Sequence, residues 1–168
     1  MANTYTLISS NVLTSSAASV TFSAIPSTYT DLVLRFSARG TGTTTSTVYV
    51  RFNGTTANYS YTQLIGTGSA ASSSRASATT FITSLENRGS YTANTFSSNE
   101  IYIPSYTAAQ NKPVSLFNVQ EDNATAAIMS NVAGLWSNTA AITEVSLAPD
   151  VDSFATGSSF YLYGISKN

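Results

Sequence analysis

The chain has 168 residues, of which 42% are hydrophobic and only 9% are charged, and its formal net charge is -1. This length and hydrophobic content are typical of one folded domain with its own core, and they exclude a chain that is disordered for lack of apolar residues. The near-zero charge argues against nucleic acid as a partner, because proteins that bind a phosphate backbone present clustered positive charge.

Cysteine is absent, which excludes disulfides and thiolate metal sites. The residues from Met1 to Ile8 contain no basic cluster and no long apolar run, so we expect no cleaved secretory signal. No later stretch is apolar for the length that a membrane helix needs, so we expect no membrane partner.

Alternation of apolar and polar residues predicts β-strands along the whole chain. In chain order we expect strands over 5–9, 19–23, 31–39, 47–53, 59–65, 100–103, 114–120, 127–133, 142–148 and 159–165. In the clearest of them, Leu32, Leu34, Phe36 and Ala38 share one face. A helical turn over 126–136 is the alternative for one segment, but Gly134 and β-branched neighbours favour a strand.

Two local features refine these strands. Asn53-Gly54 tolerates positive φ, which predicts a hairpin between strands 47–53 and 59–65. Further along, Leu116, Phe117 and Val119 break the alternation of their strand, which indicates either a bulge or a strand that is buried on both faces.

The segment 66–93 differs from the rest of the chain. It begins with Gly66-Thr67-Gly68-Ser69 and continues with a run rich in Ala and Ser, which supplies no side chains for a core. We therefore expect a long surface loop or arm here, with a short strand over 80–85 at most.

The pattern as a whole predicts an all-β fold: an antiparallel two-sheet β-sandwich, jelly-roll-like, formed by residues 1–168 as a single domain with one long surface loop. Unequal loops between many antiparallel strands favour the jelly roll over a simple meander.

Candidate catalytic groups are few. Histidine is absent, which removes the commonest general base and every Ser–His or Cys–His nucleophile. A Ser–Lys arrangement would need Lys112 or Lys167, and both are expected to be solvated. The carboxylates fall mostly at strand ends and turns, where solvation explains them, and Asp31 is expected to cap the turn before its strand. We expect no catalytic residues and no enzyme.

Ligand motifs are equally sparse. Asp150-Val151-Asp152 resembles a fragment of a calcium loop but lacks the further spaced acids and the glycine, so we expect no metal site and no cofactor. Tyrosines pair on strand faces, Tyr59 with Tyr61 and Tyr161 with Tyr163. Such faces either pair across strands inside the sandwich or stack against sugar rings or a protein partner.

Several stretches resemble small virion structural proteins of tailed bacteriophages. They are the run from Phe22 to Arg35, Phe52-Asn53-Gly54, the run from Ile101 to Tyr106, the run from Gly134 to Thr143, and Tyr161-Leu162-Tyr163-Gly164-Ile165. They follow in order from the first third of the chain to its end, and the segment 66–93 is not among them. The resemblance implies a structural component of the virion, and it carries over no functional residue.

From these observations we expect a capsid decoration (cement) protein on the outer surface of the phage head, assembled in the host cytoplasm. Its partner would be the major capsid protein, and local threefold points of the shell favour a homotrimer. We expect Arg75, Arg88 and Tyr91, all in the segment 66–93, to contact that partner. The alternative is a receptor-binding or carbohydrate-binding module of a tail fibre or spike.

Overall fold

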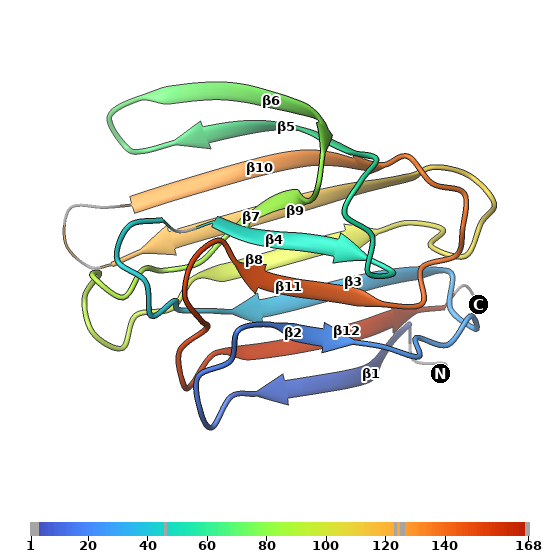
Figure 1. Ribbon diagram of the computed structural model, residues 1–168, viewed down its shortest axis with the longest axis horizontal. Coiled ribbons are helices and arrows are strands. Elements are labelled where there is room, and N and C mark those ends of the chain that lie inside the picture. Colours follow the sequence, from blue (N-terminus) through green and yellow to red (C-terminus); the bar gives the residue numbers. More distant parts are fainter. Residues whose placement is uncertain (1–3, 46, 123, 125–126, 167–168) are drawn as a thin grey trace.

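The computed structural model describes residues 4–45, 47–122, 124 and 127–166. Within these residues the chain forms twelve strands and no helix, arranged as two antiparallel sheets packed face to face (Figure 1). The expected antiparallel two-sheet β-sandwich is confirmed. The strands are β1 (Tyr5–Val12), β2 (Val20–Phe22), β3 (Asp31–Ser37), β4 (Thr47–Phe52), β5 (Tyr59–Gly66), β6 (Ala71–Thr79), β7 (Ile82–Leu85), β8 (Ser98–Ile103), β9 (Lys112–Glu121), β10 (Ala127–Trp136), β11 (Val145–Pro149) and β12 (Ser159–Ile165).

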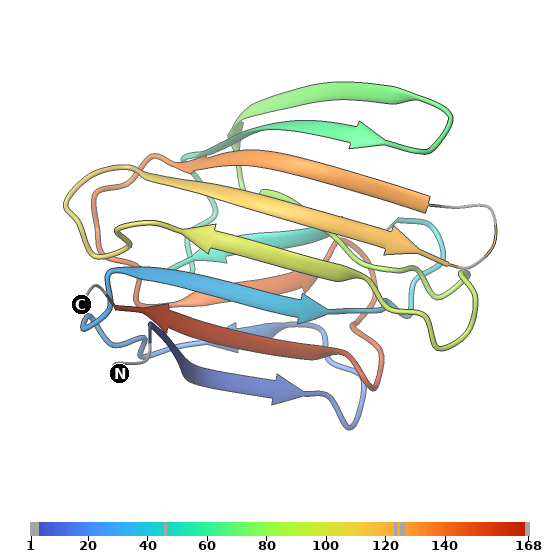
Figure 2. The ribbon, with the colours of Figure 1, turned by 180° about the vertical axis from the view of Figure 1, so that it is seen from behind.

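The two sheets differ in width. The larger has eight strands in the order β1-β12-β3-β8-β9-β10-β5-β6, and the smaller has four in the order β2-β11-β4-β7. The smaller sheet therefore covers only part of the larger one, and the pair β5–β6 extends beyond it, as the top of Figure 1 shows. The other side of the eight-stranded sheet, which we call the outer face, has no layer over it among the described residues (Figure 2).

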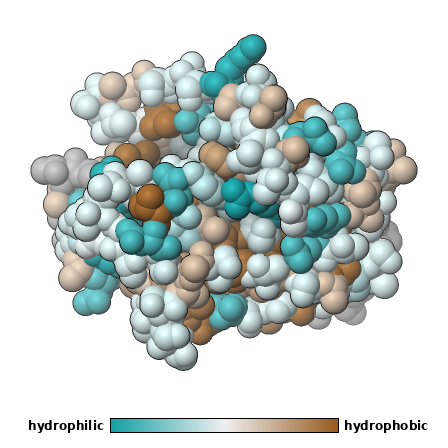
Figure 3. Space-filling model, viewed as in Figure 1, coloured by the Kyte–Doolittle hydropathy of each residue, from teal (hydrophilic) through white to brown (hydrophobic). Residues whose placement is uncertain are grey.

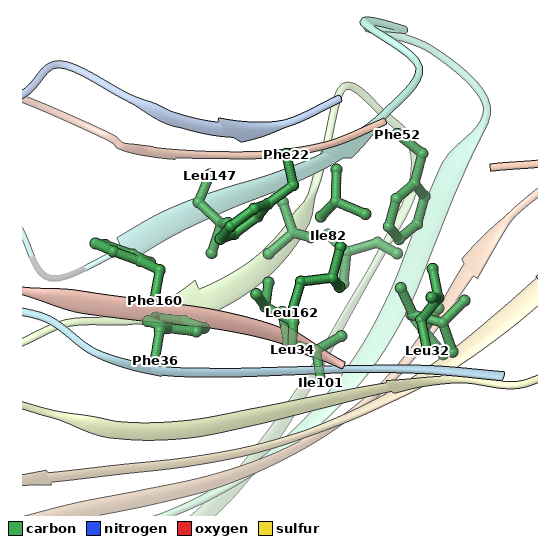
Figure 4. Packing of buried hydrophobic residues seen from close by; sticks show 14 of the residues in the cluster. Phe22, Leu32, Leu34, Phe36, Phe52, Ile82, Ile101, Leu147, Phe160 and Leu162 are labelled. Atoms are coloured by element: carbon green, nitrogen blue, oxygen red, sulfur yellow. The ribbon is translucent and has the colours of Figure 1, made fainter. Parts of the chain in front are cut away.

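The core lies where the sheets overlap. Alternate residues of β3 point into it, and Leu32, Leu34 and Phe36 are buried as the alternation predicts. Phe22 and Leu147 face them from the four-stranded sheet (Figure 4). At one end of the core the Trp136 ring packs against those of Phe52 and Tyr59, with centroids 5.7 and 6.3 Å away, so the single tryptophan is a core residue.

The hairpin expected between β4 and β5 is wrong. Asn53 and Gly54 do adopt positive φ, of 51° and 64°, but the chain passes there from one sheet to the other. β4 pairs with β7 and β11, whereas β5 pairs with β6 and β10. The Tyr59 hydroxyl accepts a hydrogen bond of 2.8 Å from the Phe52 backbone N–H, which ties the end of β4 to the start of β5 at this crossing.

The expectation for 66–93 is only partly correct. β7 lies where a short strand was expected over 80–85, but the long loop before it is wrong, because β6 occupies much of it and forms a true hairpin with β5. The turn closes through a bond of 2.9 Å from Thr67 N–H to Ala70 C=O, with Gly68 at a φ of 81°. β6 was missed because it is an exposed edge strand with no inward aliphatic row to reveal it.

β9 has neither the bulge nor the burial on both faces that its sequence indicated as alternatives. Its burial alternates strictly, and its pairing with β8 and β10 shows no shift of register. The inward row begins with Lys112, Val114 and Leu116 and continues with Asn118 and Gln120. Phe117 therefore points to the outer face.

Candidate functional site: the outer face of the eight-stranded sheet

The outer face carries the main surface depressions of the described part of the molecule. The first groove has a volume of about 550 Å³ and crosses β12, β3, β8 and β9. Two more, of about 450 and 460 Å³, lie over β5, β6, β9 and β10. A partner or ligand that needs a concave surface would therefore meet this face.

Cross-strand register builds the first groove. Tyr161 pairs with Arg35, Arg35 with Glu100, and Glu100 with Phe117. The four long side chains therefore stand in one row across four adjacent strands, and Arg35 Nε donates to Glu100 Oε2 over 2.7 Å. With strands spaced about 4.8 Å apart, the two aromatic residues stand roughly 14 Å from each other.

Three serines lie beside this row. Ser37, Ser98 and Ser159 line the same groove, and their small side chains leave the depression between the taller neighbours. None of their hydroxyls hydrogen-bonds to another described residue, so all three are available to a ligand. The groove thus offers hydroxyls, one guanidinium and one carboxylate between two aromatic rings.

An apolar patch lies next to the groove. Leu64 on β5, Phe117 on β9 and Met129 on β10 are 55%, 46% and 47% exposed. They are neighbours because Asn131 of β10 pairs with both Leu64 and Phe117, and Met129 lies two residues before Asn131 on the same face. We call these three residues the apolar patch. Exposed apolar side chains that lie together make this patch a candidate contact surface for another protein.

The structure does not bring the three expected contact residues together. Arg75 lies on β6 and lines the second groove on the outer face, beside Thr62 and Leu135. Arg88 and Tyr91 lie in the connection between β7 and β8, where the guanidinium carbon stands 5.2 Å from the centre of the tyrosine ring. Of the three residues, only Arg75 belongs to the candidate site.

Another arginine organises that connection and was missed from the sequence. Arg39 donates to the carbonyls of Gly89, Tyr91 and Thr92 over 2.8 to 2.9 Å, and to that of Thr95 over 3.1 Å. Because both terminal nitrogens of its guanidinium bind backbone carbonyls, Arg39 has a structural role. In the sequence, the only signal of this structural role is that Arg39 lies just after the end of β3.

The candidate catalytic groups also have structural roles. Lys112 is buried, not solvated as expected, and its ammonium donates to the carbonyls of Ala108 and Gln110, while burial lowers its pKa. Lys167 lies outside the described residues. Asp31 does not cap the preceding turn: it accepts from the Ser105 N–H over 2.8 Å and from the Tyr102 hydroxyl over 2.9 Å.

The other candidate ligand groups from the sequence are Asp150 and the paired tyrosines. Asp150 accepts a hydrogen bond from the Tyr49 hydroxyl, which with burial raises the tyrosine pKa to about 12. No group of three His, Cys, Asp or Glu side chains in the described ranges is placed to hold a metal ion. Of the paired tyrosines, Tyr59 is buried in the core, whereas Tyr161 lines the first groove.

Comparison with known proteins gives no match to any family model, curated protein or solved structure. No helix long and apolar enough to cross a membrane occurs in the part of the chain that the structure describes.

Proposed function

We propose that this protein is a structural component of a tailed-bacteriophage virion, a decoration protein that binds the outer surface of the head shell and stabilises it. Its partner is the major capsid protein, and assembly takes place in the host cytoplasm. The sequence resemblance to small virion proteins supports the class of protein. The apolar patch on the outer face supports adhesion to another protein as the task.

The patch is the observation that carries the proposal. Full burial of a Leu, Phe or Met side chain is worth about 1.5 to 3 kcal/mol relative to exposure, and these three are about half exposed in the isolated chain. Covering them therefore yields a modest gain per chain. A homotrimer at a threefold point of the shell multiplies it, because the second and third contacts form within one complex.

Strand pairing supports a jelly-roll winding, as the resemblance implies. Strands early in the chain pair with late ones in reverse order: β2 with β11, β3 with β8, β4 with β7, and β5 with β6. A long hairpin rolled into two sheets has this pairing, and the additional hairpin β9–β10 widens one sheet.

Co-sedimentation with empty head shells tests the proposal. The double change Leu64→Ser and Met129→Ser is expected to weaken binding about tenfold or more, since it removes much of the apolar contact. Leu7→Ser is the matched control, because Leu7 is 51% exposed at the opposite edge of the same sheet. Equal binding by the wild-type protein and both variants would contradict the patch as the contact surface, and absence of the protein from purified virions would contradict the proposed function.

The first groove favours a second candidate function, a carbohydrate-binding module of a tail fibre or spike. Aromatic faces flanked by hydroxyls and charged groups are suited to sugar rings, and Tyr161 and Phe117 flank the groove at its two ends. This function predicts glycan binding by the isolated protein that is lost in Tyr161→Ser, together with few copies per virion. A copy number comparable to that of the shell subunit, without glycan binding, would favour decoration instead.

A further inference from the structure

One end of the sandwich interior is polar. It is the left-hand end in Figure 1, where β3 and β9 end and β8 begins. Six buried side-chain N or O atoms among the described residues have no hydrogen-bond partner. All but the indole nitrogen of Trp136 belong to this end: Glu86 Oε2, Asn87 Oδ1, Arg88 Nε, Asn99 Oδ1 and Gln120 Oε1. Four of these atoms are oxygens.

The orientation of the amide groups is fixed by the backbone. Gln120 Nε2 donates to the carbonyl of Glu86, Asn87 Nδ2 to that of Glu121 over 3.1 Å, and Asn99 Nδ2 to Ser97 Oγ over 2.7 Å and to the Phe36 carbonyl over 3.4 Å. Rotating any of these amides would set its oxygen against a carbonyl oxygen. The unpartnered amide oxygens of Asn87, Asn99 and Gln120 are therefore acceptors without a donor.

The Glu86 carboxyl group is the charged member of this set. It is 3% exposed, and its Oε2 atom has no hydrogen-bond partner. The only salt bridge among the described residues joins Arg35 to Glu100, so no described Arg or Lys neutralises Glu86. A buried carboxylate without a counter-charge is strongly unfavourable, so a bound cation would stabilise the ionised form of Glu86.

The acceptors come from facing layers of the same region. Asn99 pairs with Asn118 across β8 and β9, and Gln120 lies two residues further along β9 on the same inner face. Such diagonal neighbours are within reach of each other's side chains. Glu86 follows β7 in the opposite sheet, and Gln120 touches it directly through the hydrogen bond to its carbonyl. Glycine at position 40 makes room for the carboxyl, because a Cβ there would overlap it.

We propose that this polar interior binds one hard metal cation, with Glu86, Asn99 and Gln120 as side-chain oxygen ligands. Carboxylate and amide oxygens are the ligands that Ca²⁺ takes, in a flexible geometry, whereas Mg²⁺ demands a near-ideal octahedron and retains its waters. The cation supplies the positive charge that Glu86 lacks and satisfies acceptors that the protein leaves without a donor. It joins the two sheets at the end where the apolar core stops.

The test uses the full-length protein, stripped of metal on a chelating resin and held at pH 8 in choline chloride at constant ionic strength. We expect Ca²⁺ to raise the thermal midpoint by several degrees and to bind one ion per chain in equilibrium dialysis. A saturable shift with Na⁺ alone that Glu86→Gln abolishes would support the same site with a monovalent ion. Mg²⁺ is expected to produce a smaller shift than Ca²⁺.

Glu86→Gln is expected to abolish both the shift and the binding, while Glu144→Gln, which removes a partly exposed carboxylate on another strand connection, keeps them. The wild-type dialysis needs no variant to fold and stands alone as a test. If no cation binds with one-to-one stoichiometry, or if Glu86→Gln responds like the wild-type protein, the proposal is wrong and the acceptors are satisfied by water.

Discussion

Replacing Glu86 by glutamine is expected to flatten the pH dependence of stability in cation-free buffer. Burial raises the pKa of this carboxyl from 4.5 to about 8, so it keeps its proton in the folded protein at pH values where the unfolded chain has lost it. Between pH 4.5 and about 8 the folded state therefore binds more protons, and the free energy of unfolding falls as the pH rises. The loss is absent below pH 4.5 and complete above about pH 8.

Its magnitude follows from the two pKa values. A tenfold change in proton affinity is worth about 1.4 kcal/mol, so a rise from 4.5 to about 8 corresponds to on the order of 4 to 5 kcal/mol. A domain of this size has a total stability of about 5 to 15 kcal/mol, so the effect is a large fraction of it. This loss of stability can be measured by urea unfolding at a series of pH values from 5 to 9 (roughly one point per pH unit), from the shift of the urea midpoint with pH.

The wild-type midpoint should fall across this series, and that of Glu86→Gln should stay nearly level. Glu144→Gln provides the control, because it removes one carboxylate that is not buried and should keep the wild-type slope. Saturating Ca²⁺ should also reduce the wild-type slope, since a bound cation stabilises the ionised carboxylate. Parallel profiles for the wild-type protein and Glu86→Gln would refute the reasoning.

Three further substitutions test the fold. Ala24→Gly should stabilise the protein by about 0.5 to 1 kcal/mol in urea unfolding, because Ala24 has a φ of 54°, which glycine adopts without strain. Gly134→Ala should cost about 1 to 3 kcal/mol in the same assay, because a Cβ there would lie 2.8 Å from Val114 and 2.9 Å from Ile82. Arg39→Ala should speed proteolytic cleavage within 86–97 and cost about 2 to 3 kcal/mol, since it removes the charged donor that holds that connection.

Alternation alone was enough to predict most of the sandwich. The inward row of Leu32, Leu34 and Phe36 is buried as expected, because a strand that covers a core must place every second side chain in it. The same rule failed for β6, whose exposed Ala and Ser residues lie on an edge strand beyond the smaller sheet. There, backbone pairing with β5 forms the strand, and the side chains give no signal.

Local turn chemistry was a poorer guide, because it cannot say which strands pair. Asn53 has the conformation that a hairpin turn needs, yet its side chain bonds to the connection before β11, donating to Ala141 C=O and accepting from Thr143 N–H. The turn is thereby fixed to a third segment, and the chain crosses between sheets. The grooves could not be predicted from the sequence either, because Arg35 and Glu100 meet across a sequence separation of 65 residues.

The two sides of the molecule differ in where their exposed apolar side chains lie. Figure 3 shows the opposite side of the molecule, the view with the four-stranded sheet in front, as mostly pale with scattered brown and teal atoms. The most exposed large apolar side chains instead lie on strands of the eight-stranded sheet, apart from Val151: Tyr5, Leu7, Val12, Leu64, Phe117 and Met129. Leu64, Phe117 and Met129 form the apolar patch, whereas Tyr5, Leu7 and Val12 lie on β1 at the opposite edge of the same sheet.

β9 links the two proposals physically. A strand selected for stability alone would bury Phe117 and expose Asn118 and Gln120, because burying amides gains little and exposing an aromatic ring forfeits its transfer free energy. The alternation is set earlier in the strand by Val114 and Leu116, and with no bulge it carries through to the end. A one-residue bulge would reverse both faces at once. The regular register therefore places Phe117 of the apolar patch outside and the amides of Asn118 and Gln120 inside. The two proposals predict that binding on each face offsets this cost.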